Sequence, residues 1–189
     1  YNIEIEETEQ SDEEKEKANT RESLYLINQF AQDSFAQDLW ESSEGMAIGL
    51  SYFRERGFTD ESIRFFSLGY AAEQRDHFYK KATKAGYAEN LLEETGLVIK
   101  NERGFVDRFR GRVIFPIRSM AGRVQGFGGR ILSATAKTAK YLNSPESDVY
   151  HKRMVLYGMY EAKKAIAKED VCYLVEGYTD VIQMYQQGV

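Results

Sequence analysis

The sequence predicts an α+β fold in which helices come first, a small mixed sheet with further helices follows, and a strand–helix unit comes last. Three observations favour this fold class. Apolar residues recur at helical spacing up to Gly96, and β-branched and aromatic residues cluster over 97–132. Near the end, the apolar run 171–175 precedes Glu176 and a helical pattern, which is typical of the first unit of a parallel α/β sheet.

The N-terminal segment is rich in glutamate and lacks helical apolar spacing. Residues 1–20 are therefore expected to form an acidic linker or a disordered terminus. A helix is predicted to begin near Asn19, where the stretch NTRE is similar to a capping box. It continues through apolar residues at helical spacing, which are Leu24, Ile27, Ala31 and Phe35.

Four shorter helices and one strand are expected up to Gly96. The first helix covers 44–56, and the second lies in TDESIRFF, where Thr59 or Asp60 is the cap. The stretch SLGYA is interpreted as a strand. The last two helices end near Gly86 and Gly96, because glycine suits the position just after a C-cap.

The central part is predicted to be mainly β structure. LVIKN predicts a strand, and RVIFPIRSMAGRVQGFGGRIL predicts a hairpin that turns at SMAG. Pro116 makes the first strand of this hairpin an edge strand, or marks a bulge in it. A long loop over 133–148 and a helix over 154–169 follow. The stretch VCYLV is interpreted as a buried strand in which Cys172 is packed, and TDVIQMYQQ as the opening of another helix.

Charge is distributed unevenly along the chain. Residues 1–20 hold eight acids and two lysines, whereas residues 100–153 hold twelve Lys and Arg against four Asp and Glu. A basic block attracts polyanions such as nucleic acid or nucleotides, with a solvated charged surface as the alternative. No apolar run reaches the roughly 18 residues of a membrane span. One cysteine and two histidines make neither a disulfide framework nor a structural zinc site, and a reducing cytoplasm is expected.

Two carboxylates follow the apolar run near the C-terminal end. Glu176 would lie at the end of a parallel strand, where such sheets bind ligands, and Asp180 in the first turn of the next helix. Together they are interpreted as a partial Mg²⁺ site, because this ion prefers a few carboxylate oxygens with water and phosphate. Helix capping is the alternative for Asp180. Two acids are too few for a pair of metal ions.

Five further residues are candidates for binding phosphates, riboses or bases, and these are Arg56, Arg130, Lys140, Asn143 and Lys152. Arg130 ends GFGGR, whose glycines either let a phosphate approach closely or relieve a bulge. Lys140 and Asn143 belong to KYLNSPE, a loop that is defined enough to position a ligand. Arg56 lies in a last helical turn, where interaction with the helix C-terminus is the alternative.

Several separate stretches carry a family resemblance. DRFRGRVIFPI, GRVQGFGGRIL, KYLNSPESDVYHK, LYGMYEAKKAI and LVEGYTDVI occur in this order. They resemble the catalytic core of bacterial replicative DNA primase, the DnaG type, and YFRERGFTDESIRFFSLGYA resembles the segment that opens that core. The resemblance extends over residues 21–189.

The resemblance implies a template-directed RNA polymerase that makes short RNA primers from ribonucleoside triphosphates on single-stranded DNA. It implies a primase-core N-terminal α/β subdomain over 21–168 and the start of a Toprim α/β subdomain over 169–189. Glu176 matches the first Toprim acid and Asp180 the next, so both are expected to be catalytic and to hold part of a Mg²⁺ or Mn²⁺ site. The five basic and polar candidates match family positions that face nucleotide and template.

The same resemblance implies what lies outside these residues. The family's later D-x-D acids would follow Val189, so this chain alone is expected to bind no metal and to make no primers. The zinc-ribbon domain with its zinc, and the domain that binds the replicative helicase, are not expected within the chain. The implied compartment is the bacterial cytoplasm, at the replisome, with no membrane partner. Ala139 stands where the family has proline, so its loop is expected to be looser.

Two alternatives remain open. One is another Toprim enzyme, a topoisomerase or a nuclease, against which KYLNSPE counts. The other is a non-catalytic module that binds nucleic acid or nucleotides. The deciding observation is whether the basic side chains converge on a cleft beside Glu176.

Overall fold

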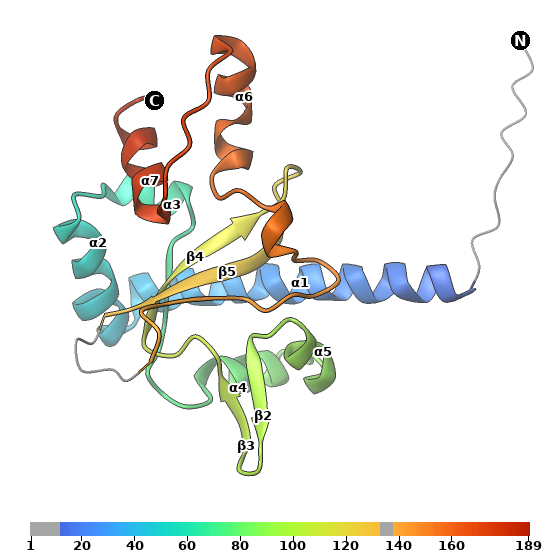
Figure 1. Ribbon diagram of the computed structural model, residues 1–189. Coiled ribbons are helices and arrows are strands. Elements are labelled where there is room, and N and C mark those ends of the chain that lie inside the picture. The colour runs from blue at the N-terminus through green and yellow to red at the C-terminus, as the bar shows by residue number, and fades with distance from the viewer. Residues whose placement is uncertain (1–11, 133–137) are drawn as a thin grey trace, which may run out of the picture.

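The computed structural model describes residues 12–132 and 138–189, and its centre is a four-stranded antiparallel sheet crossed by a long helix (Figure 1). The helices are α1 (Asp12–Glu41), α2 (Ser51–Glu55), α3 (Asp60–Phe65), α4 (His77–Lys84), α5 (Glu89–Glu94), α6 (Met159–Glu169) and α7 (Tyr178–Gln186), with a π-helix η1 (Gly45–Leu50) and a 3-10 turn η2 (Lys152–Met154). The strands are β1 (Gly69–Ala71), β2 (Val98–Asn101), β3 (Gly104–Asp107), β4 (Arg112–Arg118), β5 (Val124–Ile131) and β6 (Tyr141–Asn143). The α+β prediction is confirmed.

The β4–β5 hairpin forms the middle of the sheet, which has the order β1-β4-β5-β6. Its turn lies at SMAG as predicted, and Gly122 supplies the positive φ of 87°. Strand β1 pairs with β4 only as far as Ile114, so Pro116 lies where β4 has β5 as its one neighbour. A bulge follows between Ile117 and Arg118. The missing N–H of Pro116 therefore costs no sheet hydrogen bond on that side.

Side chains alternate between two apolar cores along β4, one on each face of the sheet. Ile114 packs in the core that α1, α4 and α5 cover, together with Phe35 and Phe127. Val113 and Phe115 pack on the opposite face, in the core that α2, α3 and α7 cover. Figure 1 shows α6 and α7 on one side of the sheet, and α4, α5 and the β2–β3 hairpin on the other. Burial on both faces makes this hairpin the most constrained part of the fold.

A buried ion pair fastens α6 to the sheet. The Arg118 guanidinium at the end of β4 donates to Glu161 Oε1 at 2.7 Å, and the two side chains are only 13% and 7% exposed. The second guanidinium nitrogen donates to Gln32 of α1 at 3.0 Å and to Ser67 at 2.8 Å. One arginine thus connects four separate segments.

A buried carboxylate fixes the start of α4. Asp107 at the end of β3 accepts hydrogen bonds from the backbone N–H groups of Phe78 and Tyr79, at 2.7 and 3.0 Å. These are two of the N–H groups that a helix start leaves without an internal partner. Burial is the dominant influence on the carboxyl group, and it raises the pKa of Asp107 to about 6, against the lowering effect of the two N–H donors.

Three local predictions differ from the structure. Helix α1 begins at Asp12 instead of near Asn19, because Asp12, Glu13 and Glu14 all lie in its first turn, where acidic residues are favourable. The predicted acidic linker is therefore helical from residue 12 onward, and residues 1–11 lie outside the described part. Helix α6 begins at Met159 instead of residue 154, because Gly158 has a left-handed conformation.

The predicted buried strand at VCYLV is wrong. Residues 171–175 are irregular and mostly exposed, with Leu174 81% exposed, and Cys172 is an exposed thiol instead of a packed one. A strand needs a neighbour to satisfy its backbone groups, and neither described sheet includes this segment. The helix predicted after it is confirmed as α7. Strands β3 and β6 were not predicted. Within residues 12–132 and 138–189, no helix has the length and apolar character that crossing a membrane requires.

We predict that Glu161→Ala lowers the free energy of unfolding by about 3 to 5 kcal/mol, because it leaves the Arg118 charge buried without its partner. Chemical denaturation at neutral pH measures this change. The matched control is Glu22→Ala, which removes the exposed partner of Arg123 and is expected to cause little change. Equal effects of the two substitutions would contradict the role assigned to Arg118.

We also predict a pH signature for Asp107. A folded-state pKa of about 6, above the unfolded value, means that the stabilising contribution is fully present below the unfolded pKa and is lost as pH rises through 6. The free energy of unfolding of the wild type minus that of Asp107→Asn should therefore fall by about 1.4 kcal/mol between pH 5 and pH 8. For the control Asp76→Asn the difference should stay flat over this range, because the Lys80 ammonium lowers the pKa of Asp76. A flat difference for Asp107 would refute the prediction.

Candidate functional site

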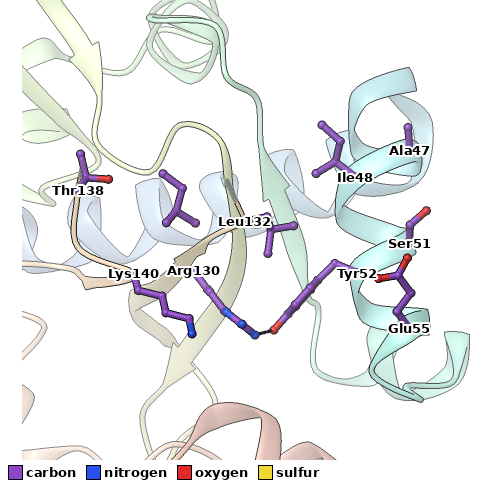
Figure 2. Close-up of a pocket in the computed structure, with 10 residues that line it drawn as sticks. Ala47, Ile48, Ser51, Tyr52, Glu55, Arg130, Leu132, Thr138 and Lys140 are labelled. Atoms are coloured by element: carbon purple, nitrogen blue, oxygen red, sulfur yellow. Dashed lines mark hydrogen bonds between the residues drawn. The ribbon is translucent and has the colours of Figure 1, made fainter. Parts of the chain in front are cut away.

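A polar pocket of about 680 Å³ opens between the η1–α2 segment and the end of β5 (Figure 2). It brings together residues that are about 80 positions apart in the sequence. Its lining residues are Ala47, Ile48, Ser51, Tyr52, Glu55, Arg130, Ile131, Leu132, Thr138 and Lys140. Two of the predicted basic residues, Arg130 and Lys140, are among them.

Tyr52 is the centre of this pocket. Figure 2 shows Arg130 reaching across the pocket, where its Nη1 donates to the hydroxyl oxygen of Tyr52. The Arg130 guanidinium carbon lies 4.8 Å from the centroid of the Tyr52 ring, and that of Arg56 lies 5.4 Å from it. Tyr141 adds a second ring, 5.6 Å from the Arg130 guanidinium. Cations at these distances from aromatic faces are electrostatically favourable.

The protonation state of Tyr52 suits a side chain that holds guanidinium groups in place. Burial raises the pKa of its hydroxyl above the ordinary value, and the positive charges of Arg130 and Arg56 oppose this only in part. Tyr52 therefore stays neutral at physiological pH. It fixes the direction of the guanidinium groups without cancelling their charge, which leaves that charge available to an anion.

The π-helix η1 sets the position of Ser51 and Tyr52. A Cβ at Gly45 would lie 1.9 Å from the carbonyl oxygen of Asp38, and a Cβ at Gly49 would lie 2.7 Å from the Leu39 side chain. Only glycine lets the segment approach α1 so closely. The wider helical turn then exposes Met46 and Ile48, which are 45% and 43% exposed, at this end of the molecule. Such turns occur often at functional sites.

Arg112 holds the segment that carries Lys140. Its buried guanidinium donates to the carbonyl oxygen of Ala139 at 3.2 Å and to Thr138 Oγ1 at 3.3 Å. The backbone N–H of Ile131 donates to the carbonyl oxygen of Lys140 at 3.0 Å, which closes the loop from the other side. Residue 139 is thus anchored without proline. The rest of the predicted loop, residues 133–137, lies outside the described residues.

Asn143 connects the sheet to the turn that bears the acids. Its Oδ1 accepts a hydrogen bond of 2.8 Å from the hydroxyl of Tyr178, which comes two residues after Glu176. The Tyr178 ring also covers Gly128, where a Cβ would lie 2.3 Å from a ring carbon. Gly128 and Arg130 are two positions apart on β5, so their side-chain directions share one face. The turn at Glu176 is therefore on the same face of the sheet as Arg130.

The two acids have different environments. Asp180 accepts a hydrogen bond of 3.0 Å from the N–H of Gly177, so the helix-capping alternative is confirmed for this residue. Glu176 is exposed. Within residues 12–132 and 138–189, no three His, Cys, Asp or Glu side chains gather closely enough to hold a metal ion. The partial metal site at Glu176 and Asp180 therefore stays a prediction, and the described residues supply no third ligand of these types beside them.

The predicted residues thus fall into three groups. Arg130 and Lys140 line the pocket, and Arg56, which does not line it, has its guanidinium carbon 5.4 Å from the Tyr52 ring centroid. Asn143 belongs to the Tyr178 contact beside the acids. Lys152 lies apart from the pocket lining, exposed in η2, where its backbone N–H donates to Glu146.

Sequence reasoning missed the aromatic and anchoring members of the site. Tyr52, Tyr141, Arg112 and Thr138 were not singled out. Tyr141 lies inside KYLNSPE, and this motif was the signal that could have found it. Tyr52 resembles any aromatic residue of an amphipathic helix, so its role became visible only from its contact with Arg130.

We predict that Arg112→Ala accelerates amide hydrogen exchange at Ile131 and lowers the free energy of unfolding by about 2 kcal/mol, because hydrogen bonds to residues 138 and 139 are lost. Hydrogen exchange followed by NMR measures the first effect. The neighbouring exposed Arg110→Ala is the control and should change neither quantity. If Ile131 exchanges at the wild-type rate in Arg112→Ala, the loop has another anchor.

Comparison with known proteins places this chain in a family. The model of the DNA primase catalytic core, N-terminal domain, matches residues 35–163. The DNA primase of Deinococcus radiodurans is 46% identical over 167 residues, which is 87% of this chain and 28% of that protein. The DNA primase of Escherichia coli K12 is 40% identical over 176 residues.

Solved structures agree with the sequence matches. The RNA polymerase domain of Mycobacterium tuberculosis primase DnaG has a TM-score of 0.85 at 38% identity, over 89% of this chain and 54% of that one. A DnaG primase catalytic domain bound to single-stranded DNA has a TM-score of 0.80 at 39% identity, over 90% of this chain and 54% of that one. The chain thus spans about half the length of these structures and less than a third of the curated relatives.

Proposed function

The chain belongs to the family of DNA primase catalytic core N-terminal domains, and from this premise we propose that it binds template and nucleotide in a primase that makes short RNA primers on single-stranded DNA. The observation that carries the proposal is the pocket lined by Arg130, Lys140 and Tyr52, in which the guanidinium groups of Arg130 and of the flanking Arg56 lie against the Tyr52 ring. That pocket shares a face of the sheet with the Glu176 turn. A relative bound to single-stranded DNA supports the same assignment.

The basic side chains have distinct tasks in this proposal. Arg130 is oriented by Tyr52 and partly buried, so it suits a fixed phosphate contact. Lys140 is exposed and carries a flexible four-carbon stem, so it suits general attraction of the template backbone or the triphosphate. Asn143 has its carbonyl oxygen engaged by Tyr178, which leaves its amide N–H groups to donate to a ribose or a base edge.

The reaction class is nucleotidyl transfer, in which a 3′-hydroxyl attacks the α-phosphorus of a nucleoside triphosphate and pyrophosphate leaves. Mg²⁺ or Mn²⁺, held by Glu176 and Asp180 together with further carboxylates, would neutralise charge on the attacking and leaving oxygens. The residues of this chain hold the phosphates in line with the attacking hydroxyl and exclude other alignments of the two. Within the proposal, residues 21–168 form the N-terminal subdomain of the core and residues 169–189 the start of a Toprim subdomain.

The wider setting belongs to the same proposal. The substrates are ribonucleoside triphosphates, the product is an RNA primer, and the setting is the replisome in the bacterial cytoplasm with a replicative helicase as partner. A second candidate is a non-catalytic nucleic-acid-binding module. The helix cap at Asp180 favours it, because the cap explains this acid without a metal ion.

We predict that this chain binds single-stranded DNA with an affinity that falls as salt rises. Arg130→Ala and Lys140→Ala should each reduce the slope of log K against log salt concentration by about 0.7, the value for one phosphate contact on a single strand. Titration of a labelled oligonucleotide at several salt concentrations measures the slope. Lys168→Ala, which removes an exposed cation of α6, is the control and should leave it unchanged. An affinity indifferent to salt would count against the proposal.

A second prediction separates the two candidate functions. Glu176→Gln, introduced into a primase that spans the full length of the relatives, should lower primer synthesis on the order of 100-fold, because a metal-binding carboxylate is lost. Binding of single-stranded DNA should stay at the wild-type level. Glu169→Gln, an exposed acid on α6, is the matched control. Full activity of Glu176→Gln would favour the non-catalytic module.

A further inference from the structure

Two glutamines of α7 hold the corner between α2 and α3. Gln183 Nε2 donates to the carbonyl oxygen of Arg56 at 2.6 Å. Gln186 Nε2 donates to the carbonyl oxygen of Gly57 at 2.8 Å, and its Oε1 accepts from the N–H of Thr59 at the same distance. Three backbone groups of one corner are thus bound by side chains that lie about 127 positions further along the sequence.

These backbone groups have no partner inside their own helices. Arg56 is the C-cap of α2, and Gly57 follows it with a left-handed φ of 79°. The carbonyl groups at a helix end need an external donor, which a side-chain amide supplies. Glutamine is suited to this task because its amide both donates and accepts. The contact therefore depends on the amides themselves, and an apolar residue of equal size could not replace them.

Apolar packing fixes the same face of α7. Ile182 is fully buried in the core of this side of the sheet. The Tyr185 ring stacks on Phe65 of α3, with centroids 4.4 Å apart and an interplanar angle of 12°. Hydrogen bonds and stacking together leave the helix one orientation on the α2–α3 corner.

The two ends of α7 touch different parts of the candidate site. Its first turn carries Asp180, follows Glu176 and contacts Asn143 through Tyr178. Its last turns hold the backbone of Arg56, whose guanidinium flanks Tyr52. Helix α7 thus extends as one element from the turn at Glu176 to the α2–α3 corner at Arg56.

We propose that Gln183 and Gln186 are positioning residues that set the separation between the acids of the Glu176 turn and the guanidinium of Arg56. The effect on catalysis rests on the proposed function. The docking, which is the fixed position of α7 on the α2–α3 corner, does not rest on it. Reacting groups that are held by two different elements lose alignment when the elements shift by about 1 Å, and rates fall accordingly.

A distance measurement tests the docking without any activity. Spin labels are placed on Thr179→Cys and Glu61→Cys in a Cys172→Ser background, which removes the single native thiol of this chain. The distance distribution between the labels should be narrow, and it should broaden or shift by several ångströms in the double variant Gln183→Ala and Gln186→Ala. The control is Gln187→Ala, an exposed glutamine one position further along, which should keep the narrow distribution. An unchanged distribution in the double variant overturns the proposal.

Steady-state kinetics of primer synthesis tests the consequence. In a primase that spans the full length of the relatives, the double variant should lose about tenfold in kcat while the KM for nucleotide stays within about twofold. Gln187→Ala should match the wild type. A shifted distance with unchanged kcat overturns the positioning role. A wild type without primer synthesis refutes the proposed function instead, and the spin-label result still decides the docking.

Discussion

The pairing of β4 with β5 is the constraint on which the rest of the structure depends. Its register places Ile114 opposite Gly129 and Phe115 opposite Gly128, and so assigns every side chain of the hairpin to one of two faces. A slip of one residue would exchange the faces. It would turn Arg130 away from Tyr52 and would remove the flat surface at Gly128 on which Tyr178 lies. The register of β4 and β5 thus determines which side chains can take part in the site.

Positive charge in this region is partly withdrawn from water. Burial lowers the pKa of Arg112, and the Nε atoms of Arg108, Arg112 and Arg130 are buried without a hydrogen-bond partner among the described residues. By contrast, the buried guanidinium of Arg118 has a carboxylate partner in Glu161. Desolvated cations without such partners carry a cost that a bound anion offsets. The comparison separates Arg118, whose charge is paired with a buried carboxylate, from three arginines that have no carboxylate within ion-pair distance among the described residues.

The sequence predicted the elements whose structure depends on residues close by in the sequence. It failed where the structure depends on contacts with distant segments. The cap at Thr59, the glycines after α4 and α5 and the hairpin turn depend on a few adjacent residues, and all three are confirmed. The strand at 171–175 depends on a partner strand, which the sequence pattern does not contain. For the site, the charged residues of GFGGR and KYLNSPE could be found by motif, but Tyr52 and the two glutamines of α7 act through contacts more than 70 positions away. Lys152 is not among the residues that line the pocket, and its role in binding nucleotide or template stays a prediction.

The turn that carries Glu176 and Asp180 caps helix α7, and in the proposed function it also binds a metal ion. A carboxylate offers about four lone-pair directions, so the bond from Gly177 to Asp180 leaves capacity for a further ligand. However, the start of α7 also carries the positive end of a helix dipole, which opposes a cation. The cap orients Asp180, and in the proposed metal site the helix dipole would weaken the hold of this carboxylate on Mg²⁺. Most of the affinity for the ion would then have to come from Glu176 and from carboxylates on other segments. In the proposed function, the cap therefore contributes the direction of Asp180 more than the strength of metal binding.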